Sequence, residues 1–463
     1  MTLTGTELPL LRTTPPGPSS RDWVQRLARV ECPAITARRQ RRGGRDPIVW
    51  AEARGANVVD ADGNRYVDLS GGFGVAAVGH RHPKVVEAAR AQVDQLVHAM
   101  GDLFPSREKI RLGERLAELT PGDLQHSILG ANGADAVEAA IKTAMIATGR
   151  RRVLAFHAGY HGMSLGALGV SGYRDAFRQP FGAATVQNLR LPYPACHDCP
   201  LGLERATCGM ACADFVERVL GDDTFGAEDV AAVIVEPIQG RGGDVVPPDG
   251  WLRRLREVTR DRGILLILDE IYTGFGRTGS MFVCEAEGVI PDVLCVGKAL
   301  GGGAPVSAAI GRAEVMEAWG ATTGEGLHTS TFLGNPLTCA MALATLDVIE
   351  TEGLVGRAAA SGARLAAALT DALGGVDGVG PIRGRGLMLG VPFVGEDGRP
   401  RAGAGVDAMV ALLERGFVTS PGGPMGDVLS LSPPLVITDE QLDAAVEAIV
   451  ASVEAMHASV PVG

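Results

Sequence analysis

The chain is poor in lysine and in aromatic residues. Only four of its 43 basic residues are lysines, Lys84, Lys109, Lys142 and Lys298, and aromatic residues make up 5% of its 463 positions. Arginine remains charged at any ordinary pH, so it cannot provide a neutral amine. A lysine retained in such a sequence is therefore a candidate for amine chemistry.

Other features are absent as well, and they narrow the class of protein. No apolar run approaches the roughly 20 residues of a membrane span, and residues 1–20 lack the basic start and apolar core of a secretory signal. A net charge of −11 argues against a nucleic acid or an anionic membrane as a partner. Eight cysteines in so long a chain do not form a disulfide scaffold. We therefore expect a cytoplasmic enzyme that acts on small molecules.

Helical and strand-like patterns alternate through the middle of the chain. Near-continuous apolar runs, VAAVIVEP and ILLILDE, begin at residues 230 and 264, and helical periodicity covers 135–148 and 251–262. This rhythm predicts an α/β fold with a mostly parallel sheet that helices cover on both faces.

The same patterns predict how the chain is divided. We expect a flexible leader, an N-terminal segment with a hairpin that packs with the small domain, a large domain, and a smaller C-terminal α+β domain. Their expected ranges are 1–20, 21–83, 84–335 and 336–463.

The strongest chemical candidate is Lys298, within CVGKALGGGAP. A flexible amine among small residues, after an apolar strand, suits a lysine that forms a Schiff base with a carbonyl cofactor. The alternative is a surface lysine beside a glycine-rich turn. Asp269 favours the first interpretation, because it ends the apolar run ILLILDE at the edge where open α/β sheets bind ligands. Such a carboxylate can hold a protonated pyridine nitrogen, as in enzymes that use pyridoxal 5′-phosphate (PLP); alternatively it binds a metal or caps a turn.

Two further segments add candidate cofactor contacts. GANGADAVEAAIK, residues 130–142, places Asn132 as the cap of a helix whose N-terminus can bind a phosphate, although an ordinary capped helix has the same pattern. Tyr160 follows another strand and offers an aromatic face for stacking on a flat ring. The run GFGRTG at 274–279 matches the dinucleotide fingerprint, but no clear helix follows it, which disfavours a nicotinamide or flavin site.

Taken in order, these motifs resemble the class III (ω-amino) aminotransferases, which are PLP-dependent enzymes of fold type I. The resemblance extends from about residue 17 to the last helix. It is carried by DEIYTGFGRTG and VGKALGGG, with DLSGGFGVAAVGHRHP, GYHGM, VEPIQG, HTSTFLGNP and RGRGLMLG in the family's order. GADAVEAAIK and YHGM are most similar to the diaminobutyrate branch.

The resemblance implies a role for each matching residue. Lys298 would form the Schiff base and carry the proton, and Asp269 would bind the ring nitrogen, with Tyr272 near the ring hydroxyl. The other implied cofactor contacts are Asn132, Gly133, Ala134, Tyr160, Glu236 (the family's gate carboxylate) and Thr331, which would reach the phosphate of a partner subunit in a homodimer with shared sites. The implied substrate contacts are Phe73, Met163 and Arg383, with Arg383 taking the α-carboxylate of the keto acid.

The chain departs from the family pattern at substrate-facing positions. Met163 stands where members that bind a distal carboxylate have Arg, Arg241 stands where Glu is common, and Ser430 replaces a frequent Arg. The expected reaction moves an amino group from a primary ω- or α-amine to a keto acid such as 2-oxoglutarate or pyruvate. A PLP-dependent racemase or epimerase and an amino-sugar transaminase of natural-product biosynthesis are the alternatives.

A cysteine-rich loop raises a possibility from another class. Cys196, Cys199, Cys208 and Cys212 lie within CHDCPLGLERATCGMAC, where four thiols could bind a structural zinc or remain reduced. A non-catalytic zinc-binding assembly protein is the corresponding alternative function. We expect no metal in the catalytic site.

Overall fold

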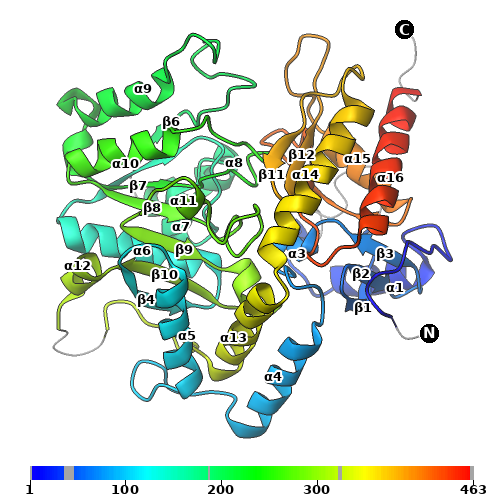
Figure 1. Cartoon of the computed structure of the whole chain (residues 1–463), viewed down its shortest axis with the longest axis horizontal. Coiled ribbons are helices and arrows are strands. Elements are labelled where there is room, and N and C mark those ends of the chain that lie inside the picture. The colour runs from blue at the N-terminus through cyan, green and yellow to red at the C-terminus, as the bar shows by residue number, and fades with distance from the viewer. Residues whose placement is uncertain (1–2, 36–45, 186–187, 322–325, 459–463) are drawn as a thin grey trace.

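The computed structural model describes residues 3–35, 46–185, 188–321 and 326–458. The larger part of the molecule is built around a seven-stranded sheet (Figure 1). The strand order is β4-β10-β9-β8-β7-β5-β6. The strands are β4 (Leu124–Gly130), β5 (Arg152–Phe156), β6 (Asn188–Leu191), β7 (Val230–Val235), β8 (Leu265–Asp269), β9 (Val293–Val296) and β10 (Ser307–Arg312). Strands β9, β8, β7, β5 and β6 are parallel, whereas β10 is antiparallel to both β9 and β4. The predicted, mostly parallel sheet is confirmed.

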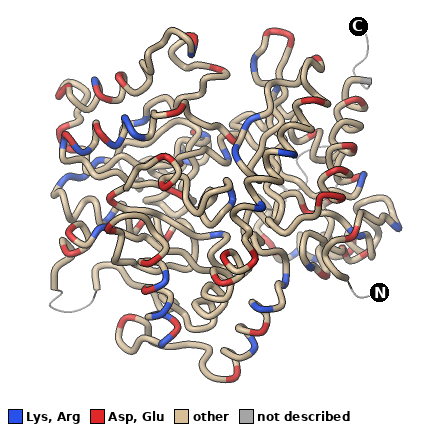
Figure 2. Tube along the Cα trace, viewed as in Figure 1, with Lys and Arg blue, Asp and Glu red and all other residues tan. Residues whose placement is uncertain are grey.

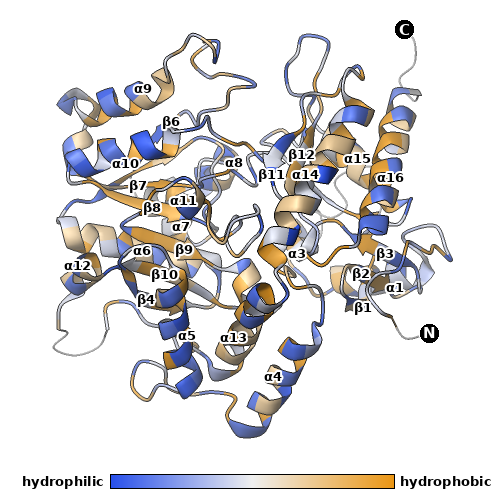
Figure 3. Cartoon of the chain, in the orientation of Figure 1, coloured by the Kyte–Doolittle hydropathy of each residue, from blue (hydrophilic) through white to orange (hydrophobic). Residues whose placement is uncertain are grey.

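Helices cover both faces of this sheet because its central strands are apolar on both sides. On β8, Ile267 belongs to the apolar cluster around α6 (Gly133–Thr148). Leu266 and Leu268 face the other way, into the cluster that includes α10 (Trp251–Asp261). Figure 3 shows these strands as a band of hydrophobic residues between helices of mixed character.

The other helices around the large sheet precede, connect or follow its strands in the sequence. They are α4 (Pro83–Gln95), α5 (Arg107–Leu119), α7 (Leu165–Val170), α8 (Asp175–Arg178), α9 (Ala211–Leu220), α11 (Val283–Ala286), α12 (Ala313–Met316) and α13 (Pro336–Thr351). The long helix α13 packs against both α4 and α5.

Two smaller sheets lie beside the large one, at the right in Figure 1. The first has the order β11-β12-β15-β14, and α14 (Leu354–Leu373) and α15 (Ala404–Leu413) pack against it. Helix α16 (Asp439–Ala458) packs against α14 and α15. Its strands are β11 (Arg383–Arg385), β12 (Met388–Pro392), β14 (Ser420–Gly422) and β15 (Val428–Leu431).

The second small sheet joins the two ends of the chain. It has the order β1-β2-β3-β13, with β1 (Trp50–Arg54), β2 (Asn57–Asp60), β3 (Arg65–Asp68) and β13 (Phe417–Val418). Strands β2 and β3 form the expected hairpin, and β13 runs parallel to β3. Through this pairing, the N-terminal hairpin shares a sheet with strand β13 of the C-terminal part. The one-turn helix α3 (Gly71–Gly74) follows β3.

The interpretation of residues 1–20 as a flexible leader is wrong for the part that the structure describes. Leu10 pairs with Arg65 in both directions, and the backbone N–H groups of Arg12 and Thr13 donate to the Asn64 side chain at 2.7 and 2.9 Å. Helix α1 (Pro18–Ala28) begins before residue 20, and its first turn donates to Asp62. The segment is fixed because the hairpin turn supplies acceptors for its backbone.

Charged residues are distributed over the described part of the chain. Figure 2 shows basic and acidic residues interspersed along the chain. Among the described residues, no helix is both long enough and apolar enough to cross a membrane.

Candidate active site

Lys298 and Asp269 lie side by side at the carboxyl ends of two neighbouring parallel strands. Asp269 is the last residue of β8 and is paired in register with Cys295 of β9, and Lys298 follows β9 by two residues. Lys298 has a φ of 41°, a left-handed conformation that is costly for a residue with a side chain. The fold thus brings together two residues that are 29 positions apart, as the sequence predicts.

The Asp269 carboxylate is buried and held by a histidine. Its Oδ2 lies 2.7 Å from Nδ1 of His161, and its Oδ1 accepts from the N–H of Ile271 at 3.1 Å. Burial disfavours the imidazolium, but the hydrogen bond to Asp269 and the negative charges of Asp269 and Glu236 outweigh this effect and raise the pKa of His161. The hydrogen bond from His161 keeps the carboxylate in one orientation. Sequence reasoning missed His161, although it lies next to Tyr160 in GYHG.

The Lys298 amine is in an environment that favours its neutral form. Burial lowers the pKa of Lys298 to about 8. The negative charges of Asp269 and Glu236 raise this pKa, and the positive charges of Arg241 and Arg277 lower it further. Its Nζ lies 4.1 Å from the centre of the Tyr272 ring. An amine with a pKa near neutrality is a much better nucleophile and base at pH 7 than an ordinary lysine.

Tyr272 forms a wall of the site and is fixed on three sides. Its hydroxyl donates to Oγ of Ser432 at 2.8 Å. A Cβ on Gly74 would lie 2.5 Å from the ring, and one on Gly240 would lie 2.2 Å from it. Only glycine at these two positions leaves room for the ring.

The N-terminus of α6 forms another part of the site. The side chain of Asn132 accepts from the N–H of Asp135 at 3.2 Å, and the Asp135 carboxylate accepts from the N–H of Asn132, which completes a capping box. Gly133 and Ala134, in the first turn, line the cavity with Asn132. First-turn N–H groups have no partner within their own helix, so they are available to an anion.

Glu236 follows β7 and organises the neighbouring loops. Its carboxylate accepts from the N–H of Tyr160 at 2.8 Å and from the N–H of Gly240 at 3.0 Å. Burial raises its pKa to about 6, with the charge of His161 opposing and that of Asp269 adding to the effect. Glu236 therefore couples the loops that follow β5 and β7.

One cavity of about 610 Å³ joins these groups. Ten of the predicted site residues line it: Phe73, Asn132, Gly133, Ala134, Tyr160, Met163, Glu236, Asp269, Tyr272 and Lys298. Arg241 and Ser430, two of the positions at which the chain departs from the family pattern, also line it. Residues that we did not predict line it as well, among them His161, Ile271, Ser420, Pro421 and Gly422.

Two predicted residues, Arg383 and Thr331, are not among the lining residues. Nε of Arg383 donates to the carbonyl of Gly243 at 2.7 Å, and its guanidinium is near Asp244 and Asp427. Thr331 is exposed on the segment before α13. The chain by itself therefore does not bring these two residues to the cavity.

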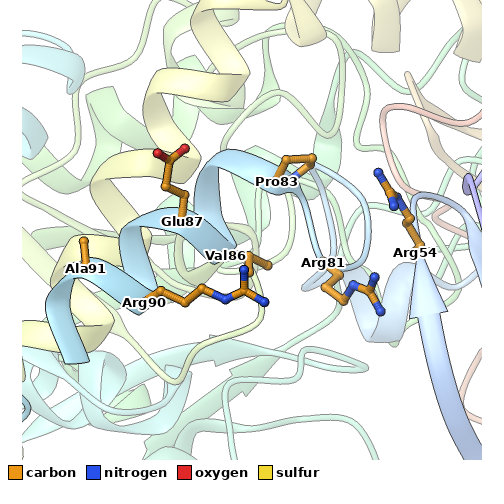
Figure 4. Close-up of a pocket in the computed structure, with 7 residues that line it drawn as sticks. All are labelled: Arg54, Arg81, Pro83, Val86, Glu87, Arg90 and Ala91. Carbon is orange, nitrogen blue, oxygen red and sulfur yellow. The ribbon is translucent and has the colours of Figure 1, made fainter. Parts of the chain in front are cut away.

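Two other hollows lack this combination of groups. The pocket in Figure 4, about 790 Å³, is lined by Arg54, Arg81 and Arg90 with residues of the first turns of α4, and it contains no lysine or buried carboxylate. A pocket of about 180 Å³ is lined by all four cysteines of the loop at 196–212. These thiols are free, and among the described residues no group of three or more His, Cys, Asp or Glu side chains is arranged to hold a metal ion.

A parallel α/β sheet with an amine and a buried carboxylate at adjacent strand ends defines an enzyme of carbonyl and amine chemistry. The family model for class-III aminotransferases matches residues 39–453, and the chain belongs to this family. It is a PLP-dependent aminotransferase, and the predicted family, fold type and cofactor are confirmed.

Relatives of this chain differ in activity. The diaminobutyrate–2-oxoglutarate aminotransferase of Rhizobium meliloti is 38% identical over 89% of this chain and 88% of its own length. The alanine/serine racemase of Pyrococcus horikoshii is 33% identical over 96% of this chain and 92% of its own. An (S)-enantioselective ω-transaminase from Thermomicrobium roseum superposes with a TM-score of 0.87 at 32% identity, covering 94% of this chain and 99% of that one.

The donor set of the cavity fits PLP. Asp269 is a buried carboxylate that an imidazole orients, Lys298 is an amine with a lowered pKa, and the N-terminus of α6 is open to a phosphate. These three groups match the ring nitrogen, the aldehyde and the phosphate of the cofactor, respectively.

Proposed function

We propose that Lys298 is the catalytic residue for amino transfer from a primary ω- or α-amine to a keto acid such as 2-oxoglutarate or pyruvate. The observation that carries this proposal is the shared cavity of the Lys298 amine and the Asp269 carboxylate. When bound there, PLP supplies a conjugated ring that stabilises negative charge on the carbon bearing the substrate nitrogen.

The residues that would hold the cofactor divide by its parts. Asp269 would bind the protonated ring nitrogen, and His161 would act as its positioning residue. Asn132, Gly133 and Ala134 would hold the phosphate at the start of α6. The other predicted contacts are Tyr160, Tyr272 and Glu236. Tyr160 would stack on the ring and Tyr272 would pack beside it, whereas Glu236 would hold the backbone of Tyr160.

Lys298 would also move the proton. A pKa of about 8 gives its Nζ a substantial neutral fraction at neutral pH, so the amine can accept a proton from the carbon bearing the substrate nitrogen. Phe73 and Met163 line the same cavity and would contact the substrate. Both are largely exposed in the single chain, which leaves this side of the cavity open to an entering amine.

We also propose that two chains form a homodimer with shared sites. Five apolar residues of the segments before α5 and before α13 are each at least half exposed: Met100, Leu103, Phe104, Leu327 and Phe332. The two segments contact one another, because Thr329 donates to Asp102 at 2.7 Å and the His98 and Phe332 rings meet edge to face. Apolar patches of this kind favour association. Thr331 lies in this surface, where it would reach the phosphate bound by the partner subunit.

Two broader proposals accompany this one. The large PLP-binding domain would cover 84–335 and the small domain 336–463, with 21–83 packing on the latter, as the pairing of β3 with β13 supports. A cytoplasmic location would suit a chain whose described cysteines are all free.

The test compares Lys298→Ala with Lys84→Ala, since Lys84 is on the surface of α4, pairs with Glu352 and does not line the cavity. Purified protein would be given a panel of amines with 2-oxoglutarate and pyruvate. We expect the visible absorbance of bound PLP and the formation of product amino acid in the wild type and in the Lys84→Ala variant, and neither in Lys298→Ala. Full turnover by Lys298→Ala would contradict the proposal.

The same assay separates amino transfer from racemisation. An aminotransferase consumes one keto acid for each amine, and with amine alone it accumulates pyridoxamine phosphate. Inversion of a single amino acid without any keto acid would instead favour the racemase alternative.

A further inference from the structure

Arg241 is an arginine in the cavity that the proposed mechanism does not use. It follows the VEPIQG segment after β7 and lines the cavity with Lys298 and Asp269. Its carbonyl accepts from the N–H of Gly423 at 3.0 Å, so the backbone is tied to the turn after β14. Arg241 therefore lies where the sheet and the C-terminal part meet.

Two tyrosine rings hold its guanidinium in place. The Cζ atom lies 5.3 Å from the centre of the Tyr160 ring and 5.0 Å from that of Tyr173. The two rings contact each other edge to face at 6.2 Å, and the Tyr173 hydroxyl donates to the Gly423 carbonyl at 3.1 Å. Cation–π contacts of this type fix a guanidinium without using any of its N–H donors.

Among the residues that the structure describes, the Arg241 guanidinium has no anionic partner. Within the described ranges it forms no ion pair and no hydrogen bond, and its buried Nε has no acceptor. The nearby acids have other contacts: Glu236 accepts from two backbone N–H groups, and Asp269 pairs with His161. Oδ2 of Asp244 accepts from Ser430 at 2.6 Å, and its Oδ1 is buried without a hydrogen-bond partner among the described residues. A buried donor without an acceptor is costly, so an anion that enters the cavity would remove this cost.

We propose that Arg241 binds the carboxylate of the keto-acid acceptor and of the amino acid formed from it. This inference rests on the proposed function and assigns a specificity-determining residue to it. It also reassigns the role expected of Arg383, whose Nε is used by the Gly243 carbonyl and which does not line the cavity. A planar guanidinium offers two parallel N–H donors to a carboxylate, which selects keto acids over neutral ketones.

The positive charge at position 241 favours acceptors that carry a carboxylate. Where the family commonly has glutamate, this chain presents a cation in the cavity that contains Lys298, and Ser430, which replaces a frequent arginine, lines the same cavity. The acceptor is therefore bound by Arg241, in the loop after β7. No acidic partner has to leave Arg241 before the acceptor binds.

The experiment compares pyruvate with pyruvamide, in which a neutral carboxamide replaces the carboxylate at nearly constant shape. Arg241→Met is the test variant. Arg174→Met is the matched control, because Arg174 lies 5.3 Å from the same Tyr173 ring but does not line the cavity. We expect Arg241→Met to raise the KM for pyruvate about 10- to 100-fold, the range of a charge-assisted hydrogen bond, and to change that for pyruvamide about threefold or less. Arg174→Met should leave both unchanged.

A binding measurement provides a readout apart from turnover. Calorimetric titration of the PLP-loaded protein with butyrate should give a weaker affinity in Arg241→Met than in the wild type, with butyramide unaffected. Arg241→Lys keeps the positive charge and loses the two parallel N–H donors. Its affinity for butyrate should lie between those of Arg241→Met and the wild type.

Several outcomes would overturn the inference while the proposed function stands. They are an equal loss for pyruvate and pyruvamide, a selective loss only in Arg383→Met, or a fall in PLP affinity in Arg241→Met that accounts for the lost rate. If wild-type protein bound no PLP and transferred no amino group, the proposed function itself would fail.

Discussion

The lowered pKa of Lys298 leads to a quantitative prediction for the cofactor-free protein. A lysine with the ordinary pKa of 10.5 is about 0.03% neutral at pH 7, whereas one with a pKa of about 8 is about 9% neutral. The neutral amine is the reactive form, and at pH 7 this form is about 300-fold more abundant for Lys298 than its ordinary pKa would allow. The reaction of Lys298 with a small acylating reagent at pH 7 should be faster for this reason, by a factor below about 300 because a less basic amine is intrinsically less nucleophilic.

The scarcity of lysine makes this measurable residue by residue. Trace labelling over a series of pH values, followed by peptide mass spectrometry, gives a separate rate profile for each of the four lysines. The profile of Lys298 should rise with pH, reach half of its maximum near pH 8 and level off above about pH 9. The exposed Lys84 serves as the internal reference for reagent reactivity.

Two variants that remove a nearby charge should change the pKa of Lys298 in opposite directions. Asp269 raises the pKa of Lys298 and Arg241 lowers it. Asp269→Asn should therefore move the inflection below that of the wild type, and Arg241→Met should move it above. A wild-type inflection near 10.5, or shifts of both variants in the same direction, would refute the electrostatic reasoning.

Three further predictions concern the surroundings of the site. His161→Phe removes the partner of a buried carboxylate and should cost about 3–5 kcal/mol of unfolding free energy in urea, whereas His126→Phe, at an exposed position of β4, should cost little. Gly240→Ala places a Cβ 2.2 Å from the Tyr272 ring and should weaken PLP binding about tenfold or more in a fluorescence titration, while Gly182→Ala, with open space around it, should not. Burial raises the pKa of Asp244 from 3.8 to about 8, so between these values the folded state binds a proton that the unfolded state has lost, and stability falls as pH rises. Asp244→Asn should remove that part of the slope between pH 5 and pH 8, and an unchanged slope would contradict the assignment.

The elements around Lys298 and Asp269 could be predicted because their signals are local. Strand β7 is apolar at every position, and the run that ends at Asp269 has no competing helical period, so parallel buried strands were the only simple interpretation. The ends of parallel strands meet at one edge, and this places the two residues together without any knowledge of packing.

Contacts between side chains distant in sequence could not be predicted in this way. His161 and Asp269 are 108 positions apart, and nothing in either segment specifies that Nδ1 meets Oδ2. Strand β10, with the sequence SAAIGR, is short and rich in small residues, so its pattern is weak, and its place between β4 and β9 depends on the packing of the whole sheet. The N-terminal segment was misjudged for the same reason, since Asn64 and Asp62 fix it through bonds that span more than 40 residues.

The wall formed by Tyr272 has a consequence for the order in which the protein matures during synthesis. Tyr272 emerges from the ribosome 160 residues before Ser432, which fixes its hydroxyl, and the cavity also requires Ser420, Pro421 and Gly422 of β14. A nascent chain that already contains Lys298 therefore still lacks one side of its site. Stable capture of the cofactor must wait until nearly the whole chain has been translated, and a chain truncated before β14 would contain the reactive lysine without the cavity that controls it.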